Sequence, residues 1–323
     1  MLTMIPKENY LRVLRHDHPE WVPLVRECDD WIGPPVVERP DRAGLDAFGV
    51  RWNYEASAEG GTFPAQGGHT ITDLAQWRRQ ITIPDLARFD WSEPARAAAA
   101  VDRPTRVIVG FVEMGLFERS YLLLGMDEAL VAYVTHPELM YDLLGELADY
   151  KIALIRRLHE AIRMDILWYG DDWGNQRSLF LPPPVWRRVV RPHTQRIYDC
   201  AKSLGIMIDQ HSCGKVDEVV GDMVEMGATM WNPCQPCNDL AGLKKKYGGR
   251  IAFSGGIDSQ FVLARRGVTA DEVRAHVRLR IDQMAAGGGY VATPSHGVPY
   301  DKAIFDAMND EIRTYGRAYY AKK

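Results

Sequence analysis

The chain has 323 residues, of which 46% are hydrophobic and 25% charged, and its net charge is −4. This is enough material for one large α/β domain over residues 1–323. The weakly acidic balance argues against nucleic-acid partners, and no apolar run is long enough to cross a membrane. Five cysteines without a secretory signal predict a cytoplasmic protein with free thiols.

The first hundred residues predict a helix, a strand and a long irregular segment. Residues 1–20 should hold an amphipathic N-terminal helix, from Pro6 to His16, and a strand should follow from Trp21 to Val25. Residues 28–100 are rich in glycine, proline and aromatic residues. We predict that they form an excursion over the mouth of the fold, with a short hairpin near Phe48 to Tyr54.

From Arg106 onward, short apolar runs alternate with helical patterns. A long helix is expected from His136 to Ile162, and another from Pro182 to Leu204. Further strands should begin at Arg106, Asp165, Ile206, Ala228, Arg250 and Tyr290. This alternation is typical of βαβ units, and an eighth strand would be hidden within residues 28–100. A (β/α)8 TIM barrel is therefore favoured over an open doubly wound sheet. No glycine-rich nucleotide-binding motif follows any strand.

Polar residues follow the predicted strands at their C-terminal ends. In a barrel these ends converge on one mouth, where active sites lie. The residues concerned are Arg26, Glu113, Asp171, Asp172, His211, Cys213, Asn232, Cys234 and His296.

The segment His211-Ser212-Cys213 offers an imidazole and a thiolate on one loop. Cys234 or Cys237, together with His296, could complete a tetrahedral zinc site, and a catalytic zinc ion leaves one position open for substrate or water. The alternative is that the cysteines are small packing residues and that His211 contacts substrate through a hydrogen bond. Cys28 receives no role, and Cys237 receives none beyond that of an alternative to Cys234.

Asp171 and Asp172 are adjacent carboxylates at a strand end. Crowding of two anions raises the pKa of one of them, which would suit a general acid. The alternative is a helix cap beside a solvated acid. Glu113 is a further candidate acid, although an ion pair with Arg119 or with a lysine of the barrel would explain it equally well.

Six motifs resemble the uroporphyrinogen decarboxylase superfamily, which also contains corrinoid-linked methyltransferases. They are residues 115–119 (GLFER), 170–176 (GDDWGNQ), 211–214 (HSCG), 232–236 (NPCQP), 253–258 (FSGGID) and 294–297 (PSHG). The resemblance implies a (β/α)8 barrel with its site at the C-terminal mouth. It also implies substrate contacts from Arg26, Tyr121, Trp173, Gln176, Asn232 and His296.

Within the superfamily, the methyltransferase branch is the more similar. The decarboxylases carry an arginine-rich segment after the first strand, whereas this chain reads Val25-Arg26-Glu27-Cys28-Asp29-Asp30 and would repel a polycarboxylated porphyrinogen. His211 and Cys213 match two zinc ligands of coenzyme M methyltransferases, and His296 replaces a late cysteine. The resemblance implies transfer of an O-, N- or S-methyl group between a small methylated substrate or thiol and a corrinoid on a separate protein. The alternative is a metal-independent decarboxylase or lyase acting on a small carboxylated substrate. A homodimer is compatible with either activity.

Overall fold

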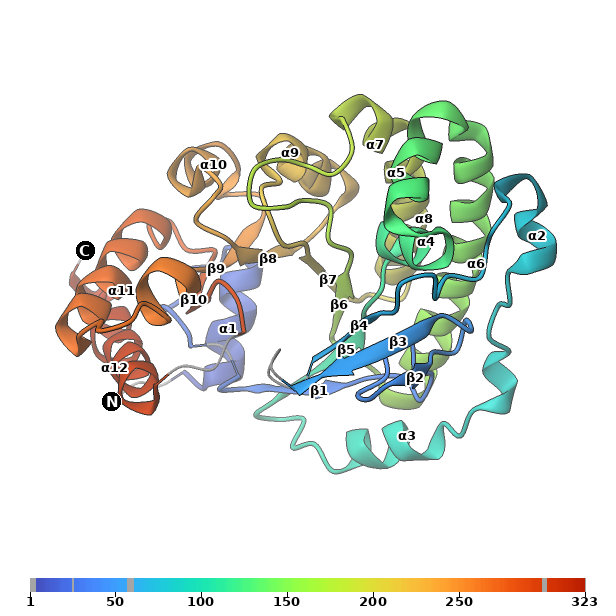
Figure 1. Ribbon diagram of the computed structural model, residues 1–323. Coiled ribbons are helices and arrows are strands. Elements are labelled where there is room, and N and C mark those ends of the chain that lie inside the picture. The colour runs from blue at the N-terminus through green and yellow to red at the C-terminus, as the bar shows by residue number, and fades with distance from the viewer. Residues whose placement is uncertain (1–3, 25, 57–60, 298–300, 323) are drawn as a thin grey trace.

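A parallel sheet of seven strands forms the centre of the protein. The computed structural model describes residues 4–24, 26–56, 61–297 and 301–322. The strands follow one another around the sheet as β1 (Asp29–Ile32), β5 (Val107–Val112), β6 (Ile166–Gly170), β7 (Met207–His211), β8 (Met230–Cys234), β9 (Ala252–Ile257) and β10 (Tyr290–Pro294). Leu24 forms a parallel bridge with Ala292 of β10, so the segment before β1 lies against the opposite edge of the sheet. The architecture is that of a (β/α)8 barrel, as predicted (Figure 1).

The predicted strand from Trp21 to Val25 is reduced to this bridge at Leu24, and Val25 itself lies outside the described residues. Pro23 has no N–H to donate, although its carbonyl accepts a hydrogen bond from the Ala292 amide at 3.2 Å. Arg26 has a φ of 66°, which turns the backbone out of the extended conformation. Pairing resumes at β1, which is the strand expected within residues 28–100.

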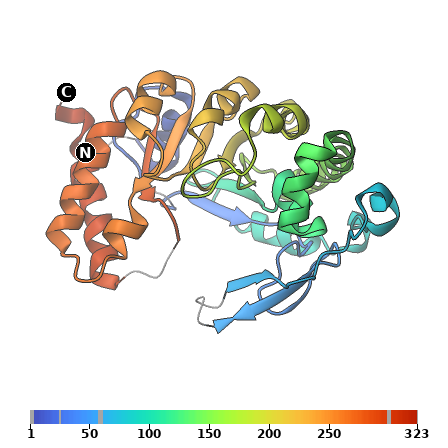
Figure 2. The same cartoon turned by 45° about the horizontal axis from the view of Figure 1, so that its top comes forward.

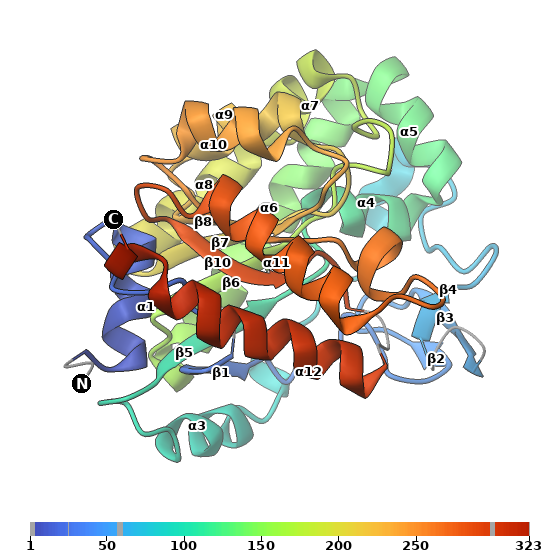
Figure 3. The same cartoon turned by 90° about the vertical axis from the view of Figure 1, so that its left-hand side faces the viewer.

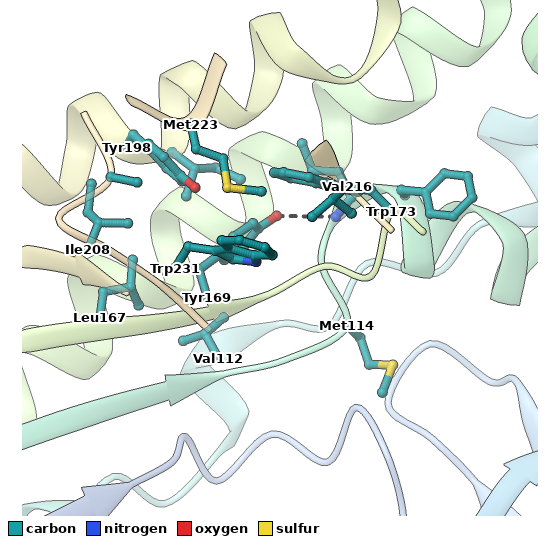
Figure 4. Close-up of a cluster of buried hydrophobic side chains, with 14 of the residues drawn as sticks. Val112, Met114, Leu167, Tyr169, Trp173, Tyr198, Ile208, Val216, Met223 and Trp231 are labelled. Atoms are coloured by element: carbon teal, nitrogen blue, oxygen red, sulfur yellow. Dashed lines mark hydrogen bonds between the residues drawn. The ribbon is translucent and has the colours of Figure 1, made fainter. Parts of the chain in front are cut away.

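Alternating side chains give the strands two buried faces. Val107, Val109 and Ile166 point into the barrel, where Tyr10 and Val13 of α1 (Pro6–Arg15) pack against them. The outward side chains of β6 and β7 pack under the helices (Figure 4). There the Tyr169 hydroxyl accepts a hydrogen bond from the Leu116 amide at 3.1 Å. Burial on both faces explains why these strands appear in the sequence as continuous apolar runs.

Helices cover the outside of the sheet (Figures 1 and 3). They are α4 (Leu116–Leu124), α5 (Met126–Thr135), α6 (Pro137–Ile162), α7 (Pro183–Val189), α8 (Arg191–Ser203), α9 (Asp217–Met226), α10 (Leu240–Tyr247), α11 (Ala270–Met284) and α12 (Lys302–Glu311). The predicted long helix is confirmed as α6. The helix expected from Pro182 to Leu204 is divided into α7 and α8, because Pro192 fits only in the first turn of a helix. Within the described ranges, no helix combines the length and apolarity needed to span a bilayer.

Residues 28–100 contain a second, antiparallel sheet of β2 (Gly44–Leu45), β3 (Arg51–Glu55) and β4 (Gly61–Pro64), which includes the predicted hairpin. This sheet projects beside the barrel (Figure 2). The short helices α2 (Trp77–Gln80) and α3 (Ser92–Ala99) follow it.

Buried ion pairs join this excursion to the barrel. Arg119 of α4 is fully buried and lies 2.6 Å from a carboxylate oxygen of Asp46 and 3.2 Å from one of Glu38. Nζ of Lys151 in α6 lies 2.7 Å from Oε2 of Glu38 and also donates a hydrogen bond to the backbone carbonyl of Glu113. Since Glu113 and α4 follow β5 directly, these pairs attach the excursion to the rim at the C-terminal ends of the strands.

Candidate functional site

Three potential metal ligands meet at this rim. His211 is the last residue of β7, and its Nε2 lies 3.5 Å from Sγ of Cys213 and 3.5 Å from Oδ1 of Asp172. Oδ1 of Asp172 also accepts a hydrogen bond from the Cys213 amide at 2.7 Å. The three ligand atoms lie within 4.8 Å of one another, and among the described residues this is the group that could hold a metal ion.

Close approach of two loops brings Asp172 to Cys213. Gly214 has a φ of 85°, and a Cβ atom there would lie 2.2 Å from the carbonyl carbon of Gly174. Only glycine allows both this conformation and this approach. The loop after β6 can therefore place its carboxylate beside the thiol carried by the loop after β7.

Asn232 fixes which nitrogen of His211 carries the proton. The Asn232 amide nitrogen donates to the buried carboxylate of Asp209, so its Oδ1 must face His211 Nδ1, at 2.7 Å. Oδ1 also accepts a hydrogen bond from the indole of Trp168. An oxygen in that position requires a proton on Nδ1 and leaves the lone pair of Nε2 directed at Cys213 and Asp172. This is the tautomer that a metal-binding histidine needs.

The donor set fits zinc. A carboxylate, an imidazole and a thiolate supply three ligands and leave a fourth position for substrate. Burial lowers the pKa of His211, which keeps the ring neutral, although Asp172 acts in the opposite direction. Burial, and then the neighbouring charge of Asp172, raise the pKa of the Cys213 thiol. A cation bound between these groups would reverse that shift and stabilise the thiolate.

Cys234 and His296, expected as the other two ligands, lie outside this group. A register irregularity between Trp231 and Cys234 places the thiol among the outward-facing side chains, where it donates to the Trp231 carbonyl at 3.3 Å. His296 is exposed on the loop after β10, within electrostatic range of His211. Asp172, predicted as an acid catalyst, instead joins His211 and Cys213 in the ligand group, where the sequence predicts Cys234.

Asp171 faces away from the mouth, unlike Asp172. Its buried carboxylate accepts hydrogen bonds from the amides of Phe117 and Glu118, at 3.2 and 2.9 Å, and from the Trp173 indole at 2.8 Å. Burial raises the pKa of Asp171 to about 6. Asp171 therefore holds the N-terminus of α4, an earlier helix, and does not cap a helix that follows its own strand, which is the arrangement that the alternative reading predicted.

Glu118 is a second carboxylate at the mouth, and the sequence reasoning gave it no role. It lies in the first turn of α4 and accepts a hydrogen bond from the Tyr121 hydroxyl at 3.4 Å. Burial raises its pKa well above the usual value, and the charges of Asp172, Asp171 and Glu113 raise it further. Burial also raises the pKa of Glu113. The spacing of Glu118 and Tyr121 on one helical face was the available signal.

A cavity of about 550 Å³ adjoins the ligand group beside β8, β9 and β10. Gln235 connects the two, because its side-chain oxygen accepts a hydrogen bond from the Gly214 amide at 2.7 Å. The wall is formed by Gln176, Gln235, Pro236, Cys237, Asp258, Ser259, Gln260, Phe261, Ala264, Ser295 and His296.

Only some of the predicted substrate contacts line the cavity. Gln176 and His296 line this cavity, and Tyr121 lies beside Glu118. Trp173 is buried edge-on against Trp186, and Asn232 forms a hydrogen bond with His211 Nδ1. Arg26 is exposed, with its guanidinium 5.3 Å from the centre of the Trp31 ring.

A family model and one solved structure agree with this architecture. Residues 64–309 match the family model described as uroporphyrinogen decarboxylase (URO-D). A solved methyltransferase from Methanosarcina mazei superposes with a TM-score of 0.72 at 16% identity, over 97% of this chain and 99% of that chain. A sugar phosphate isomerase/epimerase from Parabacteroides distasonis gives a TM-score of 0.35 at 10% identity, over 70% and 91% of the two chains. No curated protein sequence matches the chain.

Proposed function

The chain belongs to the uroporphyrinogen decarboxylase family, and from this premise we propose that it is a cytoplasmic, zinc-assisted methyltransferase. In the proposed reaction, a methyl group moves between a small thiol or methylated substrate and a corrinoid carried on a separate protein. The observation that carries the proposal is the group of Asp172, His211 and Cys213, with the Nε2 lone pair of His211 directed into it.

Asp172, His211 and Cys213 would hold zinc, which when bound would supply a Lewis acid that favours a thiolate over a thiol. The cavity beside them would orient the rest of the substrate. Glu118, paired with Tyr121, would take up or return the proton at the mouth. In the direction of thiol methylation, the S–H bond breaks, an S–CH3 bond forms, and the corrinoid keeps the electron pair of its broken Co–CH3 bond.

The methyltransferase from Methanosarcina mazei shares the fold over almost the whole chain, which makes methyl transfer a reasonable activity to test first. The family description itself favours a second candidate, a metal-independent decarboxylase or lyase on a small carboxylated substrate. Against that candidate, no lysine or arginine lines the described cavity, so the carboxylate would lack the usual charged partner.

The test begins with metal analysis of protein purified without chelator, where about one zinc ion per chain is expected. Methylcobalamin, as a stand-in for the corrinoid protein, and 2-mercaptoethanol are then supplied, and S-methylated product is measured by mass spectrometry. Chelator should abolish transfer and added zinc should restore it. Full activity in protein proven to be zinc-free would contradict the metal-assisted mechanism, and release of CO2 from a carboxylated substrate would select the decarboxylase.

A further inference from the structure

We propose that Ser212 is a positioning residue, whose buried hydroxyl holds the Asp172 carboxylate beside the other two members of the ligand group. Ser212 is the middle residue of the segment His211-Ser212-Cys213, so two of the ligands flank it in the chain. The third, Asp172, belongs to a different loop and needs a contact that brings it there. The proposal rests on the zinc-assisted function proposed above and names the residue that aligns its ligands.

The loops after β6 and β7 exchange two hydrogen bonds. The Cys213 amide donates to Oδ1 of Asp172 at 2.7 Å, and the Trp173 amide donates to the Ser212 hydroxyl oxygen at 2.9 Å. Each loop therefore donates once and accepts once, between neighbouring residues. A single hydrogen bond would let the loops rotate about it, whereas two bonds side by side fix both their distance and their relative orientation. The Asp172 carboxylate is held in this way at the place where a metal ligand is needed.

Trp173 gives the Ser212 hydroxyl a rigid partner. Its indole packs against Trp186, with ring centres 4.7 Å apart, and donates to the Asp171 carboxylate at 2.8 Å. Figure 4 shows Trp173 among the buried side chains beneath the helices. Because the Trp173 side chain is fixed by these contacts, its amide is fixed as well, and the hydroxyl that accepts from it ties the β7 loop to an immobile point.

The backbone of Ser212 is held separately by β8. The Ser212 amide donates to the Asn232 carbonyl at 2.8 Å, and the Trp231 indole donates to the Ser212 carbonyl at 3.2 Å. Ser212→Ala keeps both of these bonds and almost the same side-chain volume, so the variant should fold. Since the side chain is fully buried, the change leaves the Trp173 amide without an acceptor and loosens the connection to the β6 loop.

Zinc affinity tests the proposal in wild type, Ser212→Ala, Asp172→Ala and the double variant, by competition with a chromophoric chelator. We expect Ser212→Ala to weaken zinc binding about tenfold, as when a partner of a metal ligand is lost. In the Asp172→Ala background the same change should alter the affinity by at most about twofold, because the ligand through which Ser212 acts is absent. The control Ser120→Ala removes an equally buried hydroxyl, which donates to the Phe117 carbonyl at 2.7 Å, and should leave the affinity unchanged.

An unchanged affinity of Ser212→Ala would overturn the proposal, and so would equal losses in the two backgrounds, since Ser212 would then act without Asp172. If wild type itself binds no zinc, the proposed function fails, and amide hydrogen exchange on the metal-free protein decides the positioning role. The Cys213 amide should exchange about five- to tenfold faster in Ser212→Ala than in wild type, because its bond to Asp172 opens more often. Exchange of the Cys213 amide at the wild-type rate would refute the proposal.

Discussion

The two ring nitrogens of His211 make different contacts: Nε2 faces Cys213, and Nδ1 faces Asn232. The orientation of the His211 ring therefore depends on both contacts. Replacing Asn232 with alanine removes the acceptor that keeps the proton on Nδ1 and also leaves Asp209 without its amide partner. We expect Asn232→Ala to weaken zinc binding by about 10- to 100-fold, as is usual when the partner of a ligating histidine is lost. Competition with a fluorescent zinc chelator measures the affinity. Unchanged affinity would show that the Asn232 contact does not orient the ring.

Cys213 and Cys237 are both half-buried cysteines near the mouth, but only Cys213 belongs to the ligand group. Cys213→Ser should reduce zinc content from about one ion per chain to a small fraction, because a hydroxyl is a far weaker zinc ligand than a thiolate. Cys237→Ser should keep its zinc. Plasma emission spectrometry on both variants gives the answer, and equal metal loss in the two would argue for a different ligand set.

The N-terminus of α4 is the element on which the mouth depends, because it carries Glu118 and is held by Asp171. Gly115 precedes it, and a Cβ atom there would lie 2.3 Å from Cβ of Asp171. This close approach lets the carboxylate accept the amides of Phe117 and Glu118. Asp171 therefore sets the direction of α4, and with it the position of the Glu118 carboxylate.

The raised pKa of Asp171 predicts a pH dependence of stability. In the folded protein its pKa is about 6, against an ordinary value of 3.8, so between these values the folded state binds the proton and the unfolded state does not. Stability contributed by this carboxyl is therefore present below about pH 4 and is lost as pH rises towards 6, which amounts to about 2 kcal/mol between pH 4.5 and pH 7. Asp171→Asn should lack this decline.

Urea unfolding of chelated wild type and Asp171→Asn at these two pH values gives the comparison. The difference in unfolding free energy between the two proteins should be more favourable to wild type at pH 4.5 than at pH 7. Parallel behaviour at both values would mean that the pKa of the carboxyl is not raised in the folded state.

At the scale of the whole molecule, buried charges hold residues 28–100 against the barrel. Arg119→Met would leave Asp46 and Glu38 with fewer partners in a site that water does not reach, and we expect a loss of about 3–5 kcal/mol in unfolding free energy. The control is Arg88→Met, which breaks an exposed pair with Asp85 and should cost at most about 1 kcal/mol. Denaturant unfolding measures both. A loss below about 1 kcal/mol for Arg119→Met would show that the excursion is held by apolar packing instead.

The barrel, the region of the mouth and the His211–Cys213 pair could all be predicted from the amino-acid sequence. Strand and helix periodicities are local properties, and parallel strands necessarily bring their C-terminal ends to one rim. The spacing of His211 and Cys213 on one loop is likewise local. The motifs also indicated the family, which the comparison with the family model confirms.

The roles of the remaining site residues depend on contacts between distant parts of the chain, which the sequence does not reveal. Asp171 and Asp172 are neighbours in the chain, yet one caps α4 and the other meets His211. Cys234 is turned outward by a register irregularity in β8, which residue spacing does not reveal. The roles of Glu118 and Asn232 depend on contacts with residues far away in the chain. The physical reason is the same in each case: periodicity fixes which residues reach the rim, whereas packing between loops fixes the direction in which each side chain points.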